Sequence, residues 1–352
     1  MADLTVLMTV YNGLPYLHAA IRSILDQTFD NFEFLIVNDC STDDSRKAIL
    51  GYSDPRIRLI DNRENLNQTR SLNRGLAEIR TELVARMDAD DVSHPRRLER
   101  QMDYLARYPE VAAVGTHLRF INSRGDVIGG YEFPEEDLPL RWMQLFDCPV
   151  SCGAVMFKRS IVWEKLGGFD PSIRYAQDWE LWSRLLPAHR LANLPEKLVD
   201  VRQHAAAASS AAFAPMLEEQ RRIIRNNPQR LLGIEDPAGA GLARIEILLE
   251  KRLTEPGVRM DVIDTLFRLF CRRHIGAETH PGVLRILSRQ YLEVLYYSRF
   301  PRQAQAAARI LASVLQSRET AVSFFRTLQN AASQIPGHLR YWIPRSFMGA
   351  DI

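Results

Sequence analysis

The chain has 352 residues, of which 46% are hydrophobic and 25% are charged, and its formal net charge at pH 7 is +2. This composition excludes a disordered chain and predicts one large folded domain or two of ordinary size. Residues 1–205 hold 25 Lys and Arg against 30 Asp and Glu, whereas residues 206–352 hold 20 against 13. The acidic front part suits a domain that gathers carboxylates around a cation. The basic back part suits either an anionic partner or solvated helix faces.

The sequence also bears on location. Its four cysteines have neither metal-ligand spacing nor the pattern of a disulfide framework. The apolar run near the N-terminus is too short for a signal peptide, and no window reaches the roughly 18 apolar residues of a membrane span. We therefore expect a cytoplasmic protein with at most peripheral contact at the inner face of the membrane.

Strand and helix patterns alternate through the first part of the chain. This alternation predicts an α/β fold in which a mostly parallel sheet has helices on both faces. Region 117–157 is broken by several Gly and Pro residues. It predicts a partly antiparallel half that completes the sheet and forms the side on which an acceptor substrate would bind. Strands are predicted at 4–10, 32–37, 57–60, 82–87, 111–115 and 198–201, with helices between them, the first from about Leu14 and the second capped by Ser41 or Thr42.

Polar residues follow the ends of these strands. Tyr11 and Asn12 follow the first, Asp39 the second, and Met87-Asp88-Ala89-Asp90-Asp91 the fourth. Ligands bind at the carboxyl ends of the strands in such sheets. The turn after the first strand is neither a dinucleotide-binding glycine motif nor a P-loop, which argues against a nicotinamide enzyme and a P-loop NTPase.

The Asp88–Asp91 segment places three carboxylates in four residues. Buried carboxylates are unfavourable without a positive partner, and Mg²⁺ and Mn²⁺ prefer oxygen ligands together with substrate phosphates. The segment therefore predicts a divalent-cation site. The alternative is an acidic cap for the helix that begins near Pro95.

A second candidate lies in the helix predicted from about Gln177. Asp178 falls in its first turn, where the helix dipole favours a charged carboxylate, and an ionised carboxylate can act as a general base. The alternative is a helix cap without a catalytic role. Further on, His204 follows the strand at 198–201 and is either structural or a ligand.

Beyond about residue 212 the strand patterns stop. Successive amphipathic helices are predicted at 213–233, 240–254, 257–274, 281–298, 301–317 and 319–332. We predict two domains, 1–207 and an all-α region at 208–352. The second domain would serve homo-oligomerisation, partner docking or peripheral membrane contact.

The first 205 residues resemble inverting glycosyltransferases of family 2, which have the Rossmann-like GT-A fold. The motifs occur in family order, which makes the set specific. They are Thr9-Val10-Tyr11-Asn12, Ser23–Phe29, Asn38–Asp43, Ser71-Leu72-Asn73-Arg74-Gly75, Ala85–Asp91, Pro95-Arg96-Arg97-Leu98, Gln177–Trp182 and Arg202-Gln203-His204. The helical region lies outside the resemblance.

The resemblance implies a nucleotide-diphospho-sugar donor, typically a UDP-sugar, and a divalent cation, Mn²⁺ or Mg²⁺. It implies a glycan or glycolipid acceptor, as in surface polysaccharide or lipopolysaccharide synthesis, and no nucleic acid. Asp178 would be the general base. The nucleotide sugar would contact Thr9, Val10, Tyr11, Asn12, Asp39, Arg70 and Asp88; the metal would bind Asp90 and His204, with Asp91 as an alternative ligand; and Trp179 and Trp182 would lie on the acceptor side.

The chain departs from the family pattern at several positions. Cys40 and Asn67 stand where Gly is usual, Asn38 where a second Asp is common, and Gln177 where Glu is frequent. These departures concern donor selectivity more than the reaction. Two alternatives to the transferase are a sugar nucleotidyltransferase, whose Gly-rich basic loop is missing after the first strand, and a non-catalytic glycan-assembly partner acting through the helical region.

Overall fold

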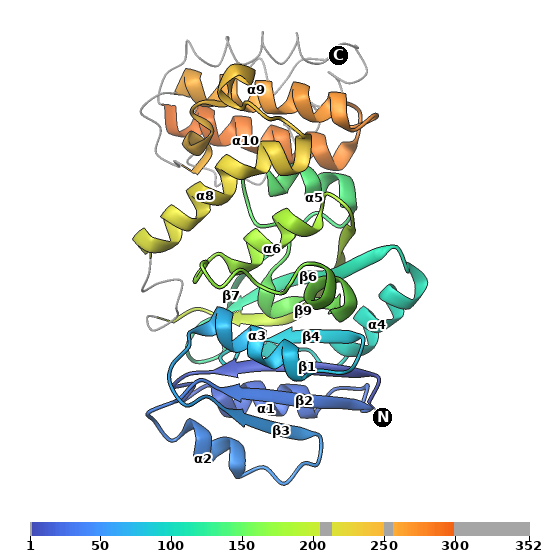
Figure 1. Cartoon of the computed structure of the whole chain (residues 1–352), viewed down its shortest axis with the longest axis vertical. Helices are drawn as coiled ribbons and strands as arrows, with labels where there is room; N and C mark the ends of the chain where they lie inside the picture. The colour runs from blue at the N-terminus through green and yellow to red at the C-terminus, as the bar shows by residue number, and fades with distance from the viewer. Residues whose placement is uncertain (1, 205–212, 250–255, 299–352) are drawn as a thin grey trace. The chain divides into compact units, whose positions relative to one another are not determined.

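The computed structural model describes residues 2–204, 213–249 and 256–298 (Figure 1). Among them, nine strands form one sheet in the order β3-β2-β1-β4-β8-β6-β9-β5, with β7 paired to β6. The strands are β1 (Leu4–Val10), β2 (Phe32–Asn38), β3 (Ile57–Asp61), β4 (Leu83–Met87), β5 (Val92–Ser93), β6 (Val111–Ile121), β7 (Val127–Tyr131), β8 (Met156–Lys158) and β9 (Arg190–Arg202).

The sheet combines a parallel half with a mixed half. Strands β3, β2, β1 and β4 are parallel, as are β6 and β9, whereas β8 runs antiparallel to β4 and β6, and β7 to β6. The prediction of an α/β fold with a mostly parallel sheet is confirmed, and so is antiparallel pairing within 117–157. The α-helices are α1 (Leu17–Leu25), α2 (Ser45–Leu50), α3 (Gln68–Glu78), α4 (Arg97–Arg107), α5 (Asp137–Gln144), α6 (Gln177–Leu185), α8 (Phe213–Leu232), α9 (Pro256–Arg273) and α10 (Pro281–Ser298).

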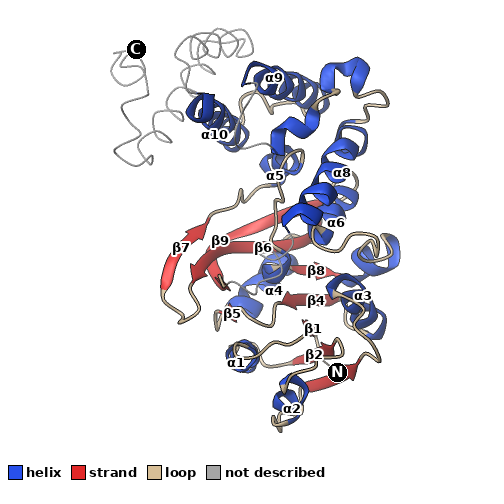
Figure 2. Ribbon diagram, turned by 90° about the vertical axis from the view of Figure 1, so that its left-hand side faces the viewer, coloured by secondary structure: helices blue, strands red, loops and turns tan. Residues whose placement is uncertain are grey.

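Helices cover both faces of the parallel half, as Figure 2 shows for α1 and α3. All seven residues of β1 are buried, because alternate side chains meet helices on opposite sides. Val6 and Met8 share a core with Leu17 and Ile21 of α1. On the other face α3 packs closely, since a Cβ added to Gly75 would lie 2.4 Å from Leu7 Cδ1.

Three local predictions were wrong. Helix α1 begins at Leu17 rather than Leu14, because a residue before proline, here Leu14, disfavours helical geometry. Neither Ser41 nor Thr42 caps the second helix, since both bond Asn12 instead. Region 117–157 contains a helix, α5, that the sequence pattern did not indicate.

The chain divides into two compact units, residues 1–140 with 147–223 and residues 141–146 with 224–352. The predicted boundary at 207 stays a prediction. In the second unit, Trp142 packs edge-on against Phe267, with ring centroids 5.6 Å apart, and Asn227 Nδ2 donates to the Gln144 carbonyl over 2.6 Å. None of the helices within the described ranges is long and apolar enough to cross a membrane.

The helical prediction for the back part holds for α8, α9 and α10 but not for residues 240–249, the part of the 240–254 prediction that the structure describes. That segment contains a π-helical turn, Ala238–Leu242, and a 3-10 helix, Ile245–Leu249. Gly241 has φ +82°, which breaks a continuous α-helix. The helices predicted at 301–317 and 319–332 lie outside the described residues.

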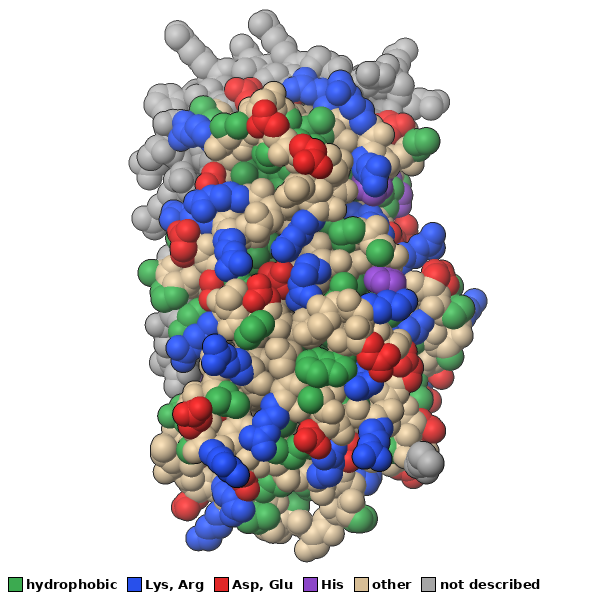
Figure 3. Space-filling view, viewed as in Figure 1, with side chains coloured by type: hydrophobic (Ala, Val, Ile, Leu, Met, Phe, Trp, Pro, Cys, Tyr) green, Lys and Arg blue, Asp and Glu red, His purple; other side chains and the backbone are tan. Residues whose placement is uncertain are grey.

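Surface charge is mixed on the face drawn in Figure 3, where Lys and Arg side chains lie among Asp and Glu side chains. The basic surplus of residues 206–352 falls in good part outside the described ranges. Its proposed meaning, an anionic partner or membrane, therefore stays a prediction.

Candidate active site

The carboxyl ends of β1, β2 and β4 meet at one edge of the sheet. The register pairs Val10 with Asn38 and Met8 with Met87, so the residues that follow these strands are neighbours. The Asp39 N–H donates to the Val10 carbonyl over 2.7 Å, which joins the first two loops directly. The polar strand ends predicted from the sequence therefore do come together.

The Asp88 carboxylate is held from two directions. It forms an ion pair with the guanidinium of Arg86, a side chain with 1% of its surface exposed, and Oδ1 accepts a 3.1 Å hydrogen bond from Gln68 Nε2. Arg97, also fully buried, lies behind them and donates through Nη2 to the Arg86 carbonyl over 2.6 Å. Burial, with the positive charge of Arg86, lowers the pKa of Arg97 to about 9. Two buried cations thus support the Asp cluster from inside the fold.

Asp90 is joined to the end of β9. Its Oδ2 lies 3.0 Å from Nε2 of His204, and its backbone carbonyl accepts a bond from Arg202 Nε. Tyr16, before α1, packs on both partners: its ring centroid is 4.8 Å from that of His204 and 4.6 Å from the Arg202 guanidinium carbon. The structure therefore brings Asp90 and His204 together, although 113 residues separate them in the sequence.

Asp91 differs from Asp90 in being almost fully enclosed. Its Oδ1 accepts a 2.9 Å bond from the Arg202 N–H, and the residue is 4% exposed, whereas the Asp90 side chain is 34% exposed. Burial, followed by the charge of Asp88, raises the pKa of Asp90 and raises that of Asp91 well above its usual range. Three carboxylates are thus crowded in a space that would be stabilised by added positive charge.

This arrangement fits a divalent cation that is shared with a phosphate ligand. The donors are carboxylate oxygens and an imidazole nitrogen, which suit Mn²⁺ or Mg²⁺. Within the described ranges, no group of three or more His, Cys, Asp or Glu side chains forms a metal cage by itself. One or two carboxylates completed by substrate phosphates is the usual arrangement for Mg²⁺, so the residues present fit the expected metal.

Asp178 lies in the first turn of α6 and reaches the same region. Its Oδ1 accepts a 2.8 Å bond from the Trp179 N–H and its Oδ2 a 3.3 Å bond from the Cys152 N–H. Burial nevertheless raises its pKa. A carboxylate with a raised pKa is a better proton acceptor than an ordinary aspartate, and this is the property that a general base needs.

One short turn connects Asp178 to the Asp cluster. Cys152 begins the 3-10 turn Cys152–Ala154, and the next residue, Gly153, faces Asp88. A Cβ added to Gly153 would lie 2.5 Å from Asp88 Oδ2 and 3.3 Å from Asp91 Oδ2. The turn therefore donates a backbone N–H to the candidate base. At Gly153, which has no side chain, its backbone also comes close to the carboxylate cluster.

The predicted nucleotide residues lie beside the cluster. Thr9 and Val10 are buried at the end of β1, whereas Tyr11 is 51% exposed and can contact a ligand. Asn12 is a structural link, because its Oδ1 accepts a 2.8 Å bond from the Thr42 N–H. Asp39 is 2% exposed, and its Oδ1 accepts bonds from Asn62 Nδ2 (2.6 Å) and the Leu66 N–H (2.8 Å).

Two of the departures from the family pattern keep the backbone that glycine would give. Cys40 has φ +59° and Asn67 has φ +69°, both in the left-handed region. The Asn67 side chain accepts a 3.3 Å bond from the N–H of Arg70, an exposed residue in the first turn of α3. The loops around the nucleotide side thus adopt a glycine-like shape without glycine.

The placement of Trp179 and Trp182 on the acceptor side stays a prediction, and the structure shows both side chains buried. Trp182 is fully buried, with Nε1 donating to the Val150 carbonyl over 2.9 Å, and Trp179 is 3% exposed. Their helical spacing packs α6 into the core. Both indoles therefore contribute to the packing of α6.

Sequence reasoning also missed several residues of the site. Arg86, Arg97 and Arg202 stand inside the quoted motifs, but nothing in their spacing shows that Arg86 pairs with Asp88, that Arg97 binds the Arg86 carbonyl or that the Arg202 N–H binds Asp91. Tyr16 and Gly153 carry no motif signal, and only the fold brings them to the site.

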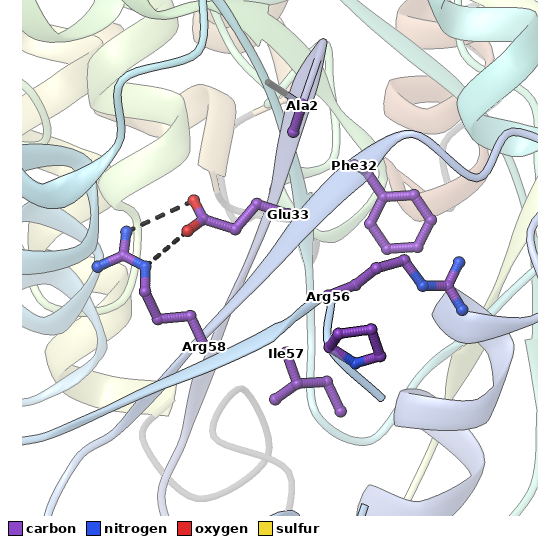
Figure 4. Close-up of a pocket in the computed structure, with 7 residues that line it drawn as sticks. Ala2, Phe32, Glu33, Arg56, Ile57 and Arg58 are labelled. Carbon is purple, nitrogen blue, oxygen red and sulfur yellow. Dashed lines mark hydrogen bonds and ion pairs between the residues drawn. The ribbon is translucent and has the colours of Figure 1, made fainter. Parts of the chain in front are cut away.

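A separate pocket of about 520 Å³ lies at the opposite ends of β2 and β3 (Figure 4). Figure 4 shows Glu33 ion-paired with Arg58, and Arg56 pairs with Asp54. Because these charges are already matched, the pocket is not the candidate active site.

Comparison with known proteins agrees with this geometry. The model of Glycosyl transferase family 2 matches residues 5–165. The chain is 32% identical over 233 residues to an uncharacterized glycosyltransferase of Haemophilus influenzae, covering 63% of this chain and 72% of that protein. It is 30% identical over 226 residues to the O-antigen biosynthesis glycosyltransferase WbnJ of Escherichia coli (60% and 84%) and 32% over 216 residues to the putative glycosyltransferase EpsE of Bacillus subtilis (59% and 76%).

Among solved structures, TarS residues 1–349 of S. aureus in complex with UDP-GlcNAc superposes with a TM-score of 0.56 at 16% identity, over 95% of this chain and 92% of that one. Fold and site together define a glycosyltransferase of the GT-A type. The chain belongs to glycosyl transferase family 2.

Proposed function

We propose that this glycosyltransferase is metal-dependent and inverting, and that it moves a sugar from a UDP-sugar to an acceptor hydroxyl in surface polysaccharide or lipopolysaccharide synthesis. The observation that carries the proposal is the Cys152–Ala154 turn, which connects the Asp178 carboxylate to the Asp88–Asp91 cluster. An inverting transfer needs both elements, a base for the acceptor and a charged region for the leaving diphosphate.

The roles follow from these positions. Asp178 takes the proton of the acceptor hydroxyl as its oxygen forms the bond to the anomeric carbon. The bond between that carbon and the diphosphate breaks on the opposite face, which inverts the configuration. The proton ends on the Asp178 carboxyl, and the electron pair leaves with the nucleoside diphosphate.

Asp90 and His204 would hold the cation, which supplies positive charge to the leaving diphosphate. The exposure of Asp90 and the enclosure of Asp91 support Asp90 as the ligand. Asp88, anchored by Arg86 and Gln68, would contact the ribose or the sugar.

The nucleotide base would lie against Tyr11 and near Asp39. Both hydrogen bonds that Asp39 accepts fall on Oδ1, so within the described residues Oδ2 remains available to a donor group of the base. Thr9, Val10 and Asn12 would line the site of the base and ribose, and Arg70 would lie near the nucleotide.

Names of similar proteins support the substrate class. One relative is an O-antigen biosynthesis glycosyltransferase, and TarS has been crystallised with UDP-GlcNAc and with UDP. Membership of a glycosyltransferase family argues against the sugar nucleotidyltransferase and the non-catalytic partner as alternatives.

A panel of nucleotide sugars tests the proposal. Binding and hydrolysis are measured with Mn²⁺, with Mg²⁺ and with a chelator, for the wild type and for Asp178→Asn. We expect one UDP-sugar to bind only with metal, and the variant to bind it without turnover. Binding of no nucleotide sugar under any condition would overturn the proposed donor site.

For residues 208–352 we propose docking of a second copy or another protein through the α-helices, with contact to anionic membrane as the alternative. Light scattering of the full chain over a range of concentrations tests the first role, and a monomer throughout would exclude the second copy. Flotation with anionic vesicles at two salt concentrations tests the alternative.

A further inference from the structure

Helix α6, which carries Asp178, begins without a side-chain cap from its own segment. The residue before its first turn is Ala176, which cannot provide one. Free N–H groups at the start of a helix need acceptors from elsewhere. Within the first turn, the Trp179 N–H is bonded by Asp178 Oδ1. The N–H groups of Ala176 at the N-cap and of the two residues before it bond instead to a residue that follows Ala176 by 43 positions, Glu219 in α8.

The Glu219 carboxylate accepts three backbone hydrogen bonds in a row. Its Oε1 accepts from the Arg174 N–H over 2.7 Å, and its Oε2 accepts from the Tyr175 N–H over 2.8 Å and the Ala176 N–H over 3.0 Å. Bonds from N–H groups to an ionised carboxylate are about twice as strong as neutral ones. One side chain thus fixes the whole turn that leads into α6.

Helix α3 holds the same loop from another direction. Thr69 Oγ1 donates to the Ile173 carbonyl over 2.7 Å. Asn73 donates through Nδ2 to the Phe169 carbonyl and accepts from the Phe169 N–H through Oδ1. The beginning and middle of the loop are therefore set by α3, whereas its last three N–H groups depend on Glu219.

A second contact from α8 lies nearby. Arg222, one turn after Glu219, donates through Nη1 to Ser172 Oγ over 3.2 Å. Both residues belong to the part of α8 that lies within the first compact unit. The start of α8 is thus docked on the loop by two side chains on one helix face.

We propose that Glu219 is a positioning residue for glycosyl transfer: by binding the N–H groups of Arg174, Tyr175 and Ala176, it sets where α6 begins and so where Asp178 meets the acceptor. This inference rests on the proposed role of Asp178 as the base. Glu219 itself touches neither the reacting atoms nor the Asp cluster in this assignment. Its effect is therefore on turnover and not on donor binding.

The test compares Glu219→Gln and Glu219→Asp with Glu218→Gln in the full chain. Gln offers one oxygen, and its NH₂ group faces N–H donors, so it cannot accept all three bonds. Asp keeps both oxygens on a side chain that is shorter by one methylene. Glu218, the neighbouring residue, forms a surface ion pair with Arg221 and serves as the matched control.

We expect Glu219→Gln to lower kcat about tenfold for the nucleotide sugar identified in the panel, because small misplacements of a reacting group are costly. KM for the nucleotide sugar and the calorimetric Kd for UDP stay within about twofold of wild type, because the contacts that bind the donor are not changed. Glu219→Asp gives an intermediate kcat. Amide hydrogen exchange in a peptide covering 169–177 becomes faster in Glu219→Gln and is unchanged in Glu218→Gln.

Two results would overturn the inference. The first is a Glu219→Gln variant whose kcat and hydrogen exchange match those of Glu218→Gln. The second is a loss of UDP binding in proportion to kcat, which indicates general destabilisation. Asp178→Asn, measured in parallel, separates this inference from the proposed function: if that variant keeps its turnover, the base assignment fails, whereas an inactive Asp178→Asn beside a fully active Glu219→Gln removes only the role of Glu219.

Discussion

The two ends of the parallel strands differ in how their charged side chains are paired. At the amino ends, each cation of the pocket in Figure 4 has its own carboxylate: Arg58 pairs with Glu33 over 2.6 Å and Arg56 with Asp54 over 2.8 Å. At the carboxyl ends, Asp88, Asp90 and Asp91 are crowded together.

The difference has a consequence for protonation. Burial and mutual repulsion raise the pKa values of Asp90 and Asp91, whereas the Arg56 partner lowers that of Asp54 against the effect of burial. Matched charges stabilise a fold modestly and need no ligand. Carboxylates left in excess are favourable only when a cation or a positively charged ligand joins them, and they therefore mark the functional edge.

The largest expected effect is at Asp178. Asp178→Asn lowers turnover of the nucleotide sugar by about 10³-fold, because removal of a general base costs about 10²–10⁴. The matched change at the opposite edge, Glu33→Gln, alters turnover by less than about twofold, since that residue is in a surface ion pair. Steady-state hydrolysis assays of both variants check this. Comparable losses of turnover in the two would show that the carboxyl-end edge is no more important for the reaction than the amino-end edge.

The metal side of the cluster comes next. Asp90→Asn weakens metal-dependent UDP binding by about 10–100-fold, in the range found when metal-site partners are changed. A chelator reduces binding by wild type to the same level. Asp126→Asn, an equivalent change in the exposed turn before β7, serves as the control in calorimetry. UDP binding by Asp90→Asn that equals wild type with Mn²⁺ would contradict the ligand assignment.

The pH dependence of turnover follows from the raised pKa of Asp178. The base works when ionised, so the rate falls about tenfold per pH unit below its folded-state pKa. This acid limb lies above the range of an ordinary aspartate, near 3.9. A raised folded-state pKa also means that protonation of Asp178 by itself favours the folded state, and circular dichroism measured across the limb separates loss of the base from unfolding. A rate that stays flat down to about pH 4 would show that burial does not raise this pKa.

Gly153 gives a steric test of the same edge. Gly153→Ala places a Cβ 2.5 Å from Asp88 Oδ2, and Asp88 cannot move freely because Arg86 and Gln68 hold it. We expect kcat/KM to fall about tenfold through displacement of this carboxylate. Gly129→Ala in β7, where a Cβ meets only Phe120 at 3.7 Å, leaves kcat/KM unchanged. Equal kcat/KM in the two variants would show that the reaction does not depend on the exact position of the Asp88 carboxylate.

The smallest effect is expected on stability at the amino-end pocket. Removing the Glu33–Arg58 pair with Glu33→Gln lowers the free energy of unfolding by about 0.2–1 kcal/mol, the range for partly exposed pairs. Urea denaturation measures it. A loss well above this range would mean that the paired edge contributes to the fold more than a solvated ion pair does.

Much of the site was predictable because it depends on strand ends. Asp39 and the Asp88–Asp91 segment follow apolar strands, and parallel strands place their carboxyl ends together. Asp178 and His204 were assigned from their motifs, and the structure puts His204 against Asp90 and joins Asp178 to the cluster through Cys152. Their catalytic and metal roles remain predictions.

The sequence by itself determined the alternation of strands and helices through β1, β2, β3 and β4, since apolar periodicity is a local property. Only the tertiary structure decided which side chains are enclosed and which distant groups meet. Trp179 and Trp182 face the core although their spacing also fits a surface stripe, and the glycine at 153 is needed only because Asp88 lies beside it. Glu219 reaches the start of α6 through the packing of α8, a contact between distant residues that no local pattern encodes.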